Sequence, residues 1–271
     1  MNLSPENPIG VFDSGIGGLT VAHAIKQALP HESMVYFGDT AHLPYGDKSE
    51  AAVQAYSIKI ADVLLQKGCK VIVIACNSAS SAAYELLKAY AGSRAKIINV
   101  IDPMVAFVQS NFKDTKVGLI GTKRTVQSNI YAKKIRQLKQ NIKLASVATP
   151  LLVPMIEEGF FNNRISHDII EKYLTDDQLA GIEALILGCT HYPLIKKEIE
   201  GFYHHRVKIL DSSEVTAVFL KNYLIENDLL APVGDEVNDE FLVSDYTQSF
   251  EESTKIFFRE KVHLEKYPLL D

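Results

Sequence analysis

Two cysteines occupy equivalent positions in two similar stretches of the sequence. Cys76 lies in VIVIACNSAS (residues 71–80) and Cys189 lies in ALILGCTHYP (residues 184–193). In each stretch an apolar run ends in a cysteine, and hydroxyl, amide or imidazole side chains follow it. A thiolate can accept a proton and a thiol can donate one, provided that the surroundings lower the pKa from about 8.5. The pair therefore indicates acid/base chemistry in which one sulfur removes a proton from a substrate carbon and the other protonates the opposite face.

Other uses of these thiols stay open. A metal site needs three or four ligands at close spacing, and Cys189 and His191 with the distant Cys76 make a poor set. A redox pair usually has the spacing C-x-x-C, which the sequence lacks. A single cysteine nucleophile would leave the second cysteine without a role, and buried structural thiols are a further alternative. Two-base racemisation, which inverts the configuration at one carbon, is the interpretation that uses both. Cys69 precedes its apolar run and is expected to pack at the other end of the sheet.

Ionisable side chains near the two cysteines could assist them. Asp13 and Ser14 end the first apolar run in GVFDSGIGGLTV, and a glycine-rich turn and a helix are expected to follow. Backbone N–H groups at such a helix start would bind an anionic group. The turn fails the last position of the dinucleotide fingerprint, and no P-loop motif occurs. Asp13 beside one thiol, and His191 with an acid such as Glu157 beside the other, could orient and deprotonate them, although Asp13 could equally cap a helix.

Polar residues that follow other apolar runs could bind a substrate. Asn77, Ser78 and Thr190 would supply hydrogen-bond donors to a carboxylate. YFGDTAHLPYG ends in a Pro-Tyr-Gly turn at residues 44–46, and such a turn is often only structural. Because this turn follows an apolar run as the cysteines do, it is also a candidate substrate loop.

Alternating strands and helices are expected to position these residues. Short β-branched runs predict strands at residues 9–12, 34–37, 71–75, 96–100, 117–120, 143–148, 184–187, 207–210 and 241–244. The clearest helical periods are at residues 49–66, 79–89, 124–138 and 215–226. This alternation predicts an α/β fold with parallel sheets covered on both faces. Ligands of such folds bind at the carboxyl ends of the strands.

The similarity of the two stretches extends over most of the chain and predicts two pseudo-symmetric halves. Gly10 in IGVFDSG and Gly118 in VGLIGTK lie 108 positions apart, and Pro44 and Pro154 lie 110 apart. We expect two parallel-sheet α/β domains with the active site in the cleft between them. Residues 1–98 with 211–271 would form the first domain, and residues 99–210 the second.

The composition excludes several classes of protein. The chain has 271 residues, 28 of them basic and 33 acidic, without a basic block, so a nucleic-acid partner is not expected. Its apolar runs are far shorter than the ~20 residues that span a membrane. Three cysteines make a disulfide framework implausible, so a reducing cytoplasm is the expected location.

The order of the motifs resembles that of the glutamate racemases in the aspartate/glutamate racemase superfamily. The matching motifs are GVFDSGIGGLTV, YFGDTAHLPYG, ACNSAS, GLIGTKRTVQS, VPMIEEG and LGCTHYPL, between residues 10 and 194. The segment after Asp211 also fits, so the resemblance covers essentially the whole chain. Each motif alone is weak, but the ordered set is specific. Ser78 stands where the family usually has threonine, and the hydroxyl is kept.

The resemblance implies interconversion of L- and D-glutamate without a cofactor or metal, which supplies D-glutamate for peptidoglycan in the bacterial cytoplasm. It implies that Cys76 and Cys189 are the acid/base thiols and that Asp13, Glu157 and His191 assist them. It also implies a homodimer. Substrate contacts are expected from Asp13, Ser14, Pro44, Tyr45, Gly46, Asn77, Ser78, Thr122, Thr125, Thr190 and His191.

Two other classes of function stay open. An aspartate racemase, a maleate isomerase or a hydantoin racemase would keep both thiols and change the pocket. A non-catalytic amino-acid-binding protein would need neither thiol, so the two matched cysteines count against it.

Overall fold

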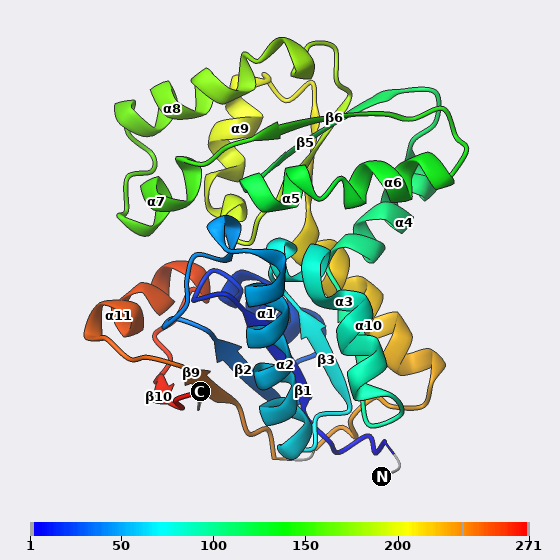
Figure 1. Ribbon diagram of the computed structural model, residues 1–271, viewed down its shortest axis with the longest axis vertical. Coiled ribbons are helices and arrows are strands. Elements are labelled where there is room, and N and C mark those ends of the chain that lie inside the picture. The colour runs from blue at the N-terminus through cyan, green and yellow to red at the C-terminus, as the bar shows by residue number, and fades with distance from the viewer. Residues whose placement is uncertain (1–2, 235, 270–271) are drawn as a thin grey trace.

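Two parallel sheets form the centres of two lobes (Figure 1). The computed structural model describes residues 3–234 and 236–269, so residues 1, 2, 235, 270 and 271 of the expected first domain lie outside the described residues. Sheet B with α5 to α9 occupies the upper lobe of Figure 1, and sheet A with α1, α2, α3 and α11 occupies the lower one.

Sheet A has six strands in the order β10-β9-β2-β1-β3-β4, and all neighbours run parallel. Its strands are β1 (Ile9–Asp13), β2 (Met34–Gly38), β3 (Val71–Ile74), β4 (Lys96–Asn99), β9 (Glu240–Val243) and β10 (Glu265–Lys266).

Sheet B has four parallel strands in the order β6-β5-β7-β8, which repeats the order β2-β1-β3-β4 within sheet A. Its strands are β5 (Lys116–Gly121), β6 (Lys143–Ala148), β7 (Ala184–Gly188) and β8 (Lys208–Asp211). Gly10 pairs with Val35, and Gly118 pairs with Ala145, so the two glycines hold equivalent places in the two registers. The expected fold of two pseudo-symmetric parallel-sheet halves is confirmed. The exact domain boundaries near residues 99 and 211 stay a prediction.

Helices connect the strands and cover the sheets. They are α1 (Leu19–Ala28), α2 (Glu50–Gln66), α3 (Asn77–Ala91), α4 (Ile101–Asn111), α5 (Lys123–Gln127), α6 (Ile130–Gln137), α7 (Leu152–Glu157), α8 (Arg164–Leu174), α9 (Lys196–Phe202), α10 (Ser212–Glu226) and α11 (Gln248–Phe257). The short 3-10 helices are η1 (Tyr45–Asp47), η2 (Asp177–Leu179) and η3 (Tyr192–Ile195). None of the helices in the described residues is both long enough and apolar enough to cross a membrane.

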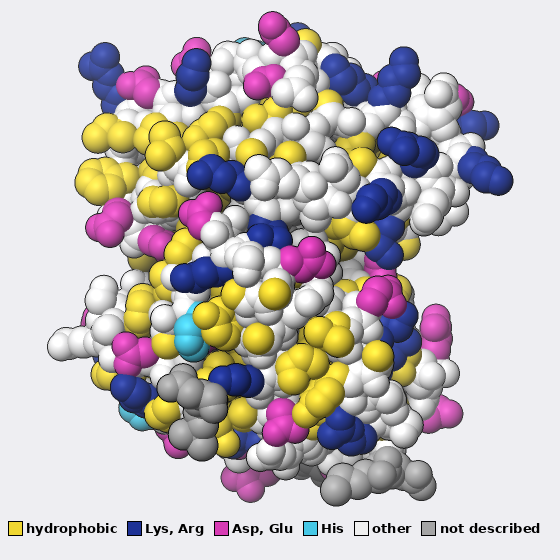
Figure 2. All heavy atoms as spheres, in the orientation of Figure 1, with side chains coloured by type: hydrophobic (Ala, Val, Ile, Leu, Met, Phe, Trp, Pro, Cys, Tyr) yellow, Lys and Arg dark blue, Asp and Glu magenta, His cyan; other side chains and the backbone are white. Residues whose placement is uncertain are grey.

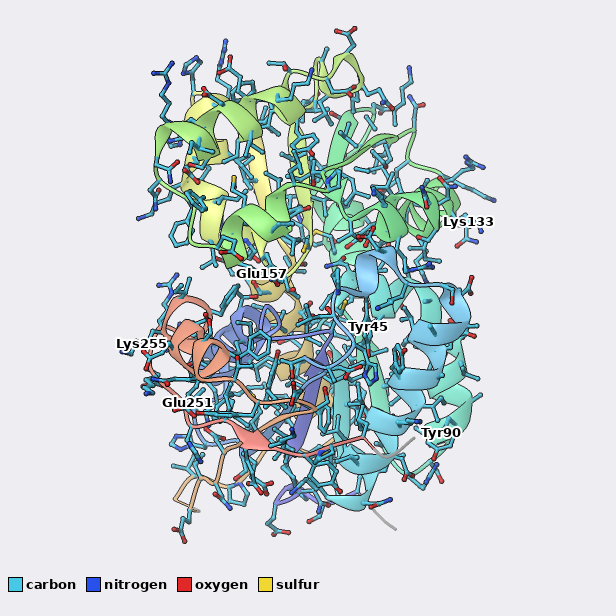
Figure 3. The ribbon with its side chains drawn as sticks, turned by 60° about the vertical axis from the view of Figure 1, so that its left-hand side comes forward. Tyr45, Tyr90, Lys133, Glu157, Glu251 and Lys255 are labelled. Atoms are coloured by element: carbon cyan, nitrogen blue, oxygen red, sulfur yellow. The ribbon has the colours of Figure 1, made fainter. Side chains whose placement is uncertain are left out.

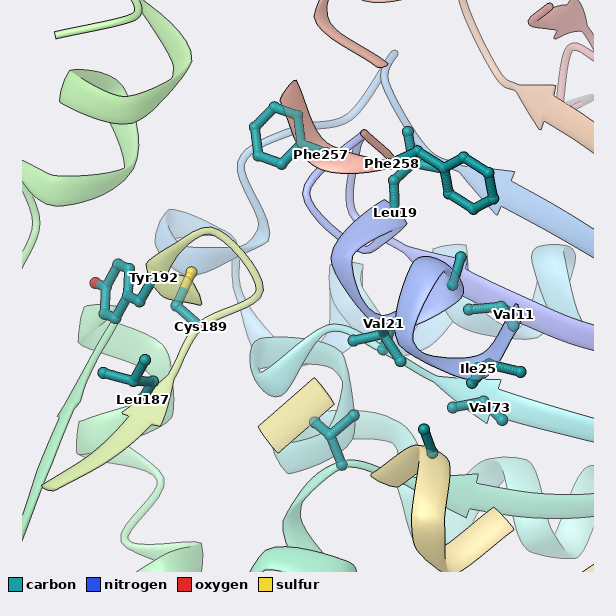
Figure 4. Close-up of a cluster of buried hydrophobic side chains, with 14 of the residues drawn as sticks. Val11, Leu19, Val21, Ile25, Val73, Leu187, Cys189, Tyr192, Phe257 and Phe258 are labelled. Atoms are coloured by element: carbon teal, nitrogen blue, oxygen red, sulfur yellow. The ribbon is translucent and has the colours of Figure 1, made fainter. Parts of the chain in front are cut away.

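Alternate residues of each strand enter different cores, as the two-residue period of a strand requires. Val11 and Val73 pack with Leu19 in the cluster beneath α1 and α10 (Figure 4). Ile72 and Ile74 pack on the opposite face, beneath α2 and α3. Because both faces of the strands β1, β2, β3 and β7 are buried, these strands consist of continuous apolar runs, which is why the sequence predicted them well.

Polar residues at the carboxyl ends of strands begin several of the following helices. Cys76 is the N-cap of α3, and its sulfur accepts the Ala79 N–H at 3.5 Å. Thr122 is the N-cap of α5, and Asp211 is the N-cap of α10. These N-caps accept backbone N–H groups that the first helical turn leaves unpaired. The strand-to-helix turns therefore fix candidate site residues at one edge of each sheet.

One expected helix and one strand differ from the prediction. The helical period over residues 124–138 is divided into α5 and α6, because Asn129 between them adopts a φ of 55° in the left-handed region. Asparagine tolerates that conformation better than most residues, and a regular helix cannot continue through it. The strand β10 was not predicted, because it has only two residues and both are exposed.

Hydrophobic side chains also lie on the surface of the upper lobe over α7 and α8 (Figure 2). Leu151, Phe160 and Ile165 are exposed there. The expected homodimer stays a prediction, since nothing in the structure shows what covers this surface.

Candidate active site

A cavity of about 280 Å³ lies where the carboxyl ends of the two sets of strands meet. Segments of both halves form its wall, and Figure 3 shows Tyr45 of the lower lobe and Glu157 of the upper lobe at the junction. The lining residues are Ser14, Gly15, Leu43, Pro44, Tyr45, Gly46, Asp47, Cys76, Asn77, Ser78, Thr122, Lys123, Thr149, Pro150, Val153, Pro154, Glu157, Gly188, Cys189, Thr190 and His191.

The cavity brings together the candidate residues that the sequence singled out, except Asp13 and Thr125. Asp13 is fully buried behind the lining residue Ser14. The hydroxyl of Thr125 lies 3.1 Å from that of the lining residue Thr122, so Thr125 supports Thr122 from outside the cavity. Both expected thiols, Cys76 after β3 and Cys189 after β7, border the same cavity.

Cys76 lies in an environment that favours the neutral thiol. Its sulfur lies 3.6 Å from the Ser14 hydroxyl. Burial raises the pKa of Cys76 to about 12, with a further contribution from the negative charge of Asp13. The hydrogen bonds with the Ala79 N–H and Ser14 oppose this shift. Cys76 therefore needs a neighbouring proton acceptor before it can act as a base.

Asp13 is the candidate proton acceptor for Cys76. It ends β1, accepts the Gly15 N–H at 3.1 Å and is approached by the Thr190 hydroxyl at 3.5 Å. Burial raises its pKa, while the charge of His191 and backbone N–H groups lower it. The N-cap of α1 is Gly18 and receives no side-chain hydrogen bond, so Asp13 does not cap that helix in the usual way.

Cys189 has a different set of neighbours. Its sulfur lies 3.7 Å from Nδ1 of His191, and Nε2 of the same ring lies 2.9 Å from a carboxylate oxygen of Glu157. Burial lowers the pKa of His191, but the hydrogen bonds and charges of Cys189 and Glu157 outweigh burial and raise it to about 10. The His191 imidazole beside the Cys189 sulfur is thus protonated at neutral pH.

Asn77 offers an unused donor to a ligand. The Tyr131 hydroxyl donates to Asn77 Oδ1 at 2.8 Å and thereby orients the amide. The Asn77 Nδ2 atom is buried and, among the described residues, has no hydrogen-bond partner. A buried donor without a partner costs about 1–3 kcal/mol, so a carboxylate in the cavity would relieve that cost.

Ser78 and Thr122 contact each other across the two halves, with their hydroxyl oxygens 2.9 Å apart.

The loop that contains Pro44 and Gly46 is fixed by Tyr45. The Tyr45 side chain is fully buried, and its hydroxyl donates to Asp39 at 2.5 Å. Asp39 also accepts from the Ser244 hydroxyl at 2.7 Å, which ties the loop to the segment after β9. Burial and the charge of Asp39 raise the pKa of Tyr45, so it stays a neutral phenol.

Several lining residues were not predicted. Thr149, Pro150, Val153 and Pro154 form the wall after β6. Their signal was the stretch LASVATPLLVP, whose place after a strand corresponds to that of the Pro-Tyr-Gly loop, but its side chains suggested no chemistry. Lys123 lies 3.7 Å from Asp47 at the exposed edge of the cavity.

The arrangement of the Cys, His, Asp and Glu side chains, as far as the structure describes them, does not suit a metal ion. Within residues 3–234 and 236–269, no group of three His, Cys, Asp or Glu side chains is placed so that it could hold a metal ion.

Comparisons with known proteins show which family the chain resembles in sequence and fold. The profile of the Asp/Glu/Hydantoin racemase family matches residues 9–220. The glutamate racemase of Geobacter metallireducens is 40% identical over 246 residues, which cover 91% of this chain and 90% of that protein. The glutamate racemase of Chlorobaculum tepidum is 37% identical over 255 residues, 94% of this chain and 93% of that protein. A crystal structure of the glutamate racemase of Francisella tularensis in complex with D-glutamate superposes with a TM-score of 0.91 at 38% identity, and covers 98% of both chains.

The chain belongs to the Asp/Glu/Hydantoin racemase family. It is therefore an isomerase of the amino-acid racemase class, and the resemblance noted in its motifs is confirmed.

Proposed function

We propose that the protein interconverts L- and D-glutamate by a two-base mechanism in which Cys76 and Cys189 are the acid/base groups. The observation that carries the proposal is that both thiols, from equivalent strand ends of the two halves, border one small cavity. The names of the similar proteins support glutamate as the substrate.

The reaction breaks the Cα–H bond on one face of the substrate and forms a new one on the other. One sulfur, as the thiolate, takes the α-proton, and the electron pair of that bond remains on the α-carbon and its carboxylate. The other sulfur, as the thiol, then gives its proton to the opposite face, so protons and charge balance. Asn77 Nδ2 and the hydroxyls of Ser78 and Thr190, which line the cavity, would donate to the carboxylate, where negative charge develops.

Each thiol has its own assistant. Asp13, whose pKa burial raises, takes the proton from Cys76 when that residue must act as the base. His191, held by Glu157, exchanges a proton with Cys189. The enzyme needs no cofactor in this scheme, because both proton transfers use side chains.

The far carboxylate of glutamate would lie against the loop that contains Pro44, Tyr45 and Gly46, near Thr122. Glutamate is favoured over aspartate by the names of the relatives above, and a shorter side chain would leave part of this wall without contact. Racemisation of aspartate or of a hydantoin is the alternative that keeps the thiols.

In the cell, this activity would supply D-glutamate for peptidoglycan from the cytoplasm. The names of the relatives support the formation of D-glutamate. Its use in peptidoglycan rests on the resemblance of the motifs alone.

The test is racemisation by the purified protein treated with EDTA. Circular dichroism should follow loss of optical activity from either enantiomer of glutamate, with slower or no change for aspartate and hydantoins. Cys76→Ala and Cys189→Ala should each abolish the reaction. Calorimetric binding of glutamate without racemisation, or activity that EDTA removes and zinc restores, would contradict the proposal.

A further inference from the structure

The glycines at the start of α1 differ in what they contact. Gly15 lines the cavity, but Gly17 and Gly18 are not among its lining residues. Their closest neighbours are instead the two ionisable side chains that flank the thiols. The stretch Gly17-Gly18 therefore requires a separate explanation.

Gly17 lies directly against the imidazole of His191. A Cβ at residue 17 would lie 2.3 Å from Cε1 and 2.5 Å from Nδ1 of that ring, and 2.8 Å from Oγ1 of Thr190. Non-bonded carbon atoms prefer separations of about 3.5–4.0 Å, so none of these contacts is possible. The backbone of Gly17 is not in the left-handed region, so only its neighbours exclude a side chain.

Gly18 lies against Asp13 in the same way. A Cβ at residue 18 would lie 2.4 Å from Cβ and 2.9 Å from Cγ of Asp13, and 3.0 Å from the Tyr36 hydroxyl. The helix start thus separates Asp13, which belongs to the same half, from His191, which belongs to the other half.

His191 cannot move aside without losing its contacts. Its two ring nitrogens face Cys189 and Glu157. The ring of Phe257 packs edge-on against it with the centroids 5.2 Å apart. The Thr20 hydroxyl donates to the carbonyl oxygen of Thr190 at 2.8 Å and so ties the same helix start to the residue before the imidazole.

We propose that Gly17 and Gly18 are positioning residues for racemisation: Gly17 makes room for His191 at Cys189, and Gly18 makes room for Asp13 at Cys76. Their missing side chains let one helix start of sheet A fix both proton-exchanging groups. This inference rests on the proposed function, because it assigns the two glycines to the two thiols of that reaction.

The pair also couples the two halves. Because His191 comes from the half built on sheet B, its close approach to Gly17 sets how near the β7 loop lies to α1. A side chain at residue 17 would displace the imidazole from the Cys189 sulfur and hold the loop away. A side chain at residue 18 would act within one half and disturb Asp13 most, with the Tyr36 hydroxyl next.

The first experiment measures Gly17→Ala in two backgrounds. In the wild-type chain, it should lower kcat for glutamate by about 10²-fold, because an assisting acid or base contributes about 10²–10⁴-fold. In the His191→Ala background the ring is absent and only the Thr190 hydroxyl stays close to residue 17. The same change should then lower kcat by less than about threefold, because the effects of residues in contact are not additive. An equal loss in both backgrounds would overturn the proposal.

Folding is measured alongside activity. If Gly17→Ala prevents folding, the double variant with His191→Ala should fold again, since the two shortest contacts, both with the ring, are gone and only the Thr190 hydroxyl stays close. Failure of both variants to fold would overturn the proposal, because it would place the conflict elsewhere. Gly201→Ala, in α9 and with no atom within 4 Å of the added Cβ, is the control and should leave kcat unchanged.

Kinetic isotope effects separate the two glycines. With α-deuterated L- and D-glutamate, Gly17→Ala should reproduce the pattern of His191→Ala, in which the isotope effect rises for one enantiomer. Gly18→Ala should reproduce the pattern of Asp13→Asn, in which it rises for the other. Identical patterns for the two alanine variants would contradict the assignment. If wild-type protein did not racemise glutamate, the proposed function would fail before any variant was measured.

Discussion

The two halves of the molecule place a cysteine at equivalent strand ends but surround it differently. Cys76 has the hydroxyl of Ser14 beside it and the negative charge of Asp13 behind it, and burial raises its pKa to about 12. Cys189 has the imidazole of His191 beside it, and the pKa of that imidazole is raised to about 10 despite burial.

This contrast shows that the repeated fold determines where the two thiols lie, whereas individual neighbouring residues determine their proton affinity. The repeat supplies position: β3 and β7 each end in a cysteine at the rim of one cavity. Proton affinity comes from residues that the repeat does not share, because Asp13 ends β1 whereas the equivalent strand β5 ends in Gly121. A substrate with two mirror-image forms needs equivalent positions for its two bases, yet each base can reach its working state by a different route.

The largest effects should come from the thiols themselves. Cys76→Ala and Cys189→Ala should each lower kcat by about 10⁴-fold or more, because each removes one of the two groups that must exchange a proton with the α-carbon. Cys69→Ala is the matched control, because Cys69 is buried in the core beneath α2 and α3. Polarimetry on the three purified variants measures their rates of racemisation and so compares the two cavity thiols with Cys69. Substantial activity without one of the cavity thiols would refute the equivalence of the two positions.

The next largest effects on kcat should come from Asp13 and His191, which assist the two thiols. Asp13→Asn and His191→Asn should each lower kcat by about 10²–10³-fold with little change in KM, because they act in proton transfer rather than in binding. Initial rates at saturating L- and D-glutamate test this. A rise in KM at constant kcat would mean that these side chains bind substrate, and the contrast between the halves would lose its meaning.

Glu157→Gln should have a smaller effect, about tenfold or less on kcat, because Glu157 acts only through His191 and is partly exposed. Glu157 raises the pKa of His191, so its loss should let the imidazole lose its proton at lower pH. The alkaline limb of the kcat profile should therefore move to lower pH.

The same linkage applies to stability. A raised folded-state pKa stabilises the fold fully below the unfolded value near 6.5, and the contribution disappears as pH rises through about 10. Urea unfolding at pH 6 and pH 10 should show Glu157→Gln destabilising only at the lower pH. If Glu157→Gln left the alkaline limb of the kcat profile at the same pH, Glu157 would not influence the pKa of the imidazole.

The smallest effects should come from the equivalent strand glycines. A Cβ at Gly118 would lie 2.8 Å from the terminal methyl groups of Ile182 and Leu185, whereas one at Gly10 would lie 3.1 Å from the Cys69 sulfur. Gly118→Ala should therefore lower the free energy of unfolding by about 1–2 kcal/mol through overpacking, and Gly10→Ala by less. Urea denaturation of both variants measures the difference, and the reverse order would contradict it.

The fold and the thiols were predictable for one physical reason. Parallel strands buried on both faces leave apolar runs, and Cys76 and Cys189 end two such runs. The repeated pattern then predicted that both would reach one cavity.

Other features depend on contacts between segments distant in sequence. Gly17 touches His191 across the two halves, and no local pattern records that contact. Thr149 and Val153 line the cavity through backbone position and shape rather than through reactive groups. The break at Asn129 follows from one left-handed residue, which the helical period of the surrounding residues conceals.

A short reaction in deuterium oxide tests the central claim most directly. Protein is given L-glutamate, and the α-position of both enantiomers is analysed by mass spectrometry after a few per cent conversion. If two thiols act on opposite faces, the D-glutamate formed carries deuterium while the remaining L-glutamate retains its proton, and the reverse reaction gives the mirror result. D-glutamate that keeps the original proton would show that a single base serves both faces, and would contradict the account.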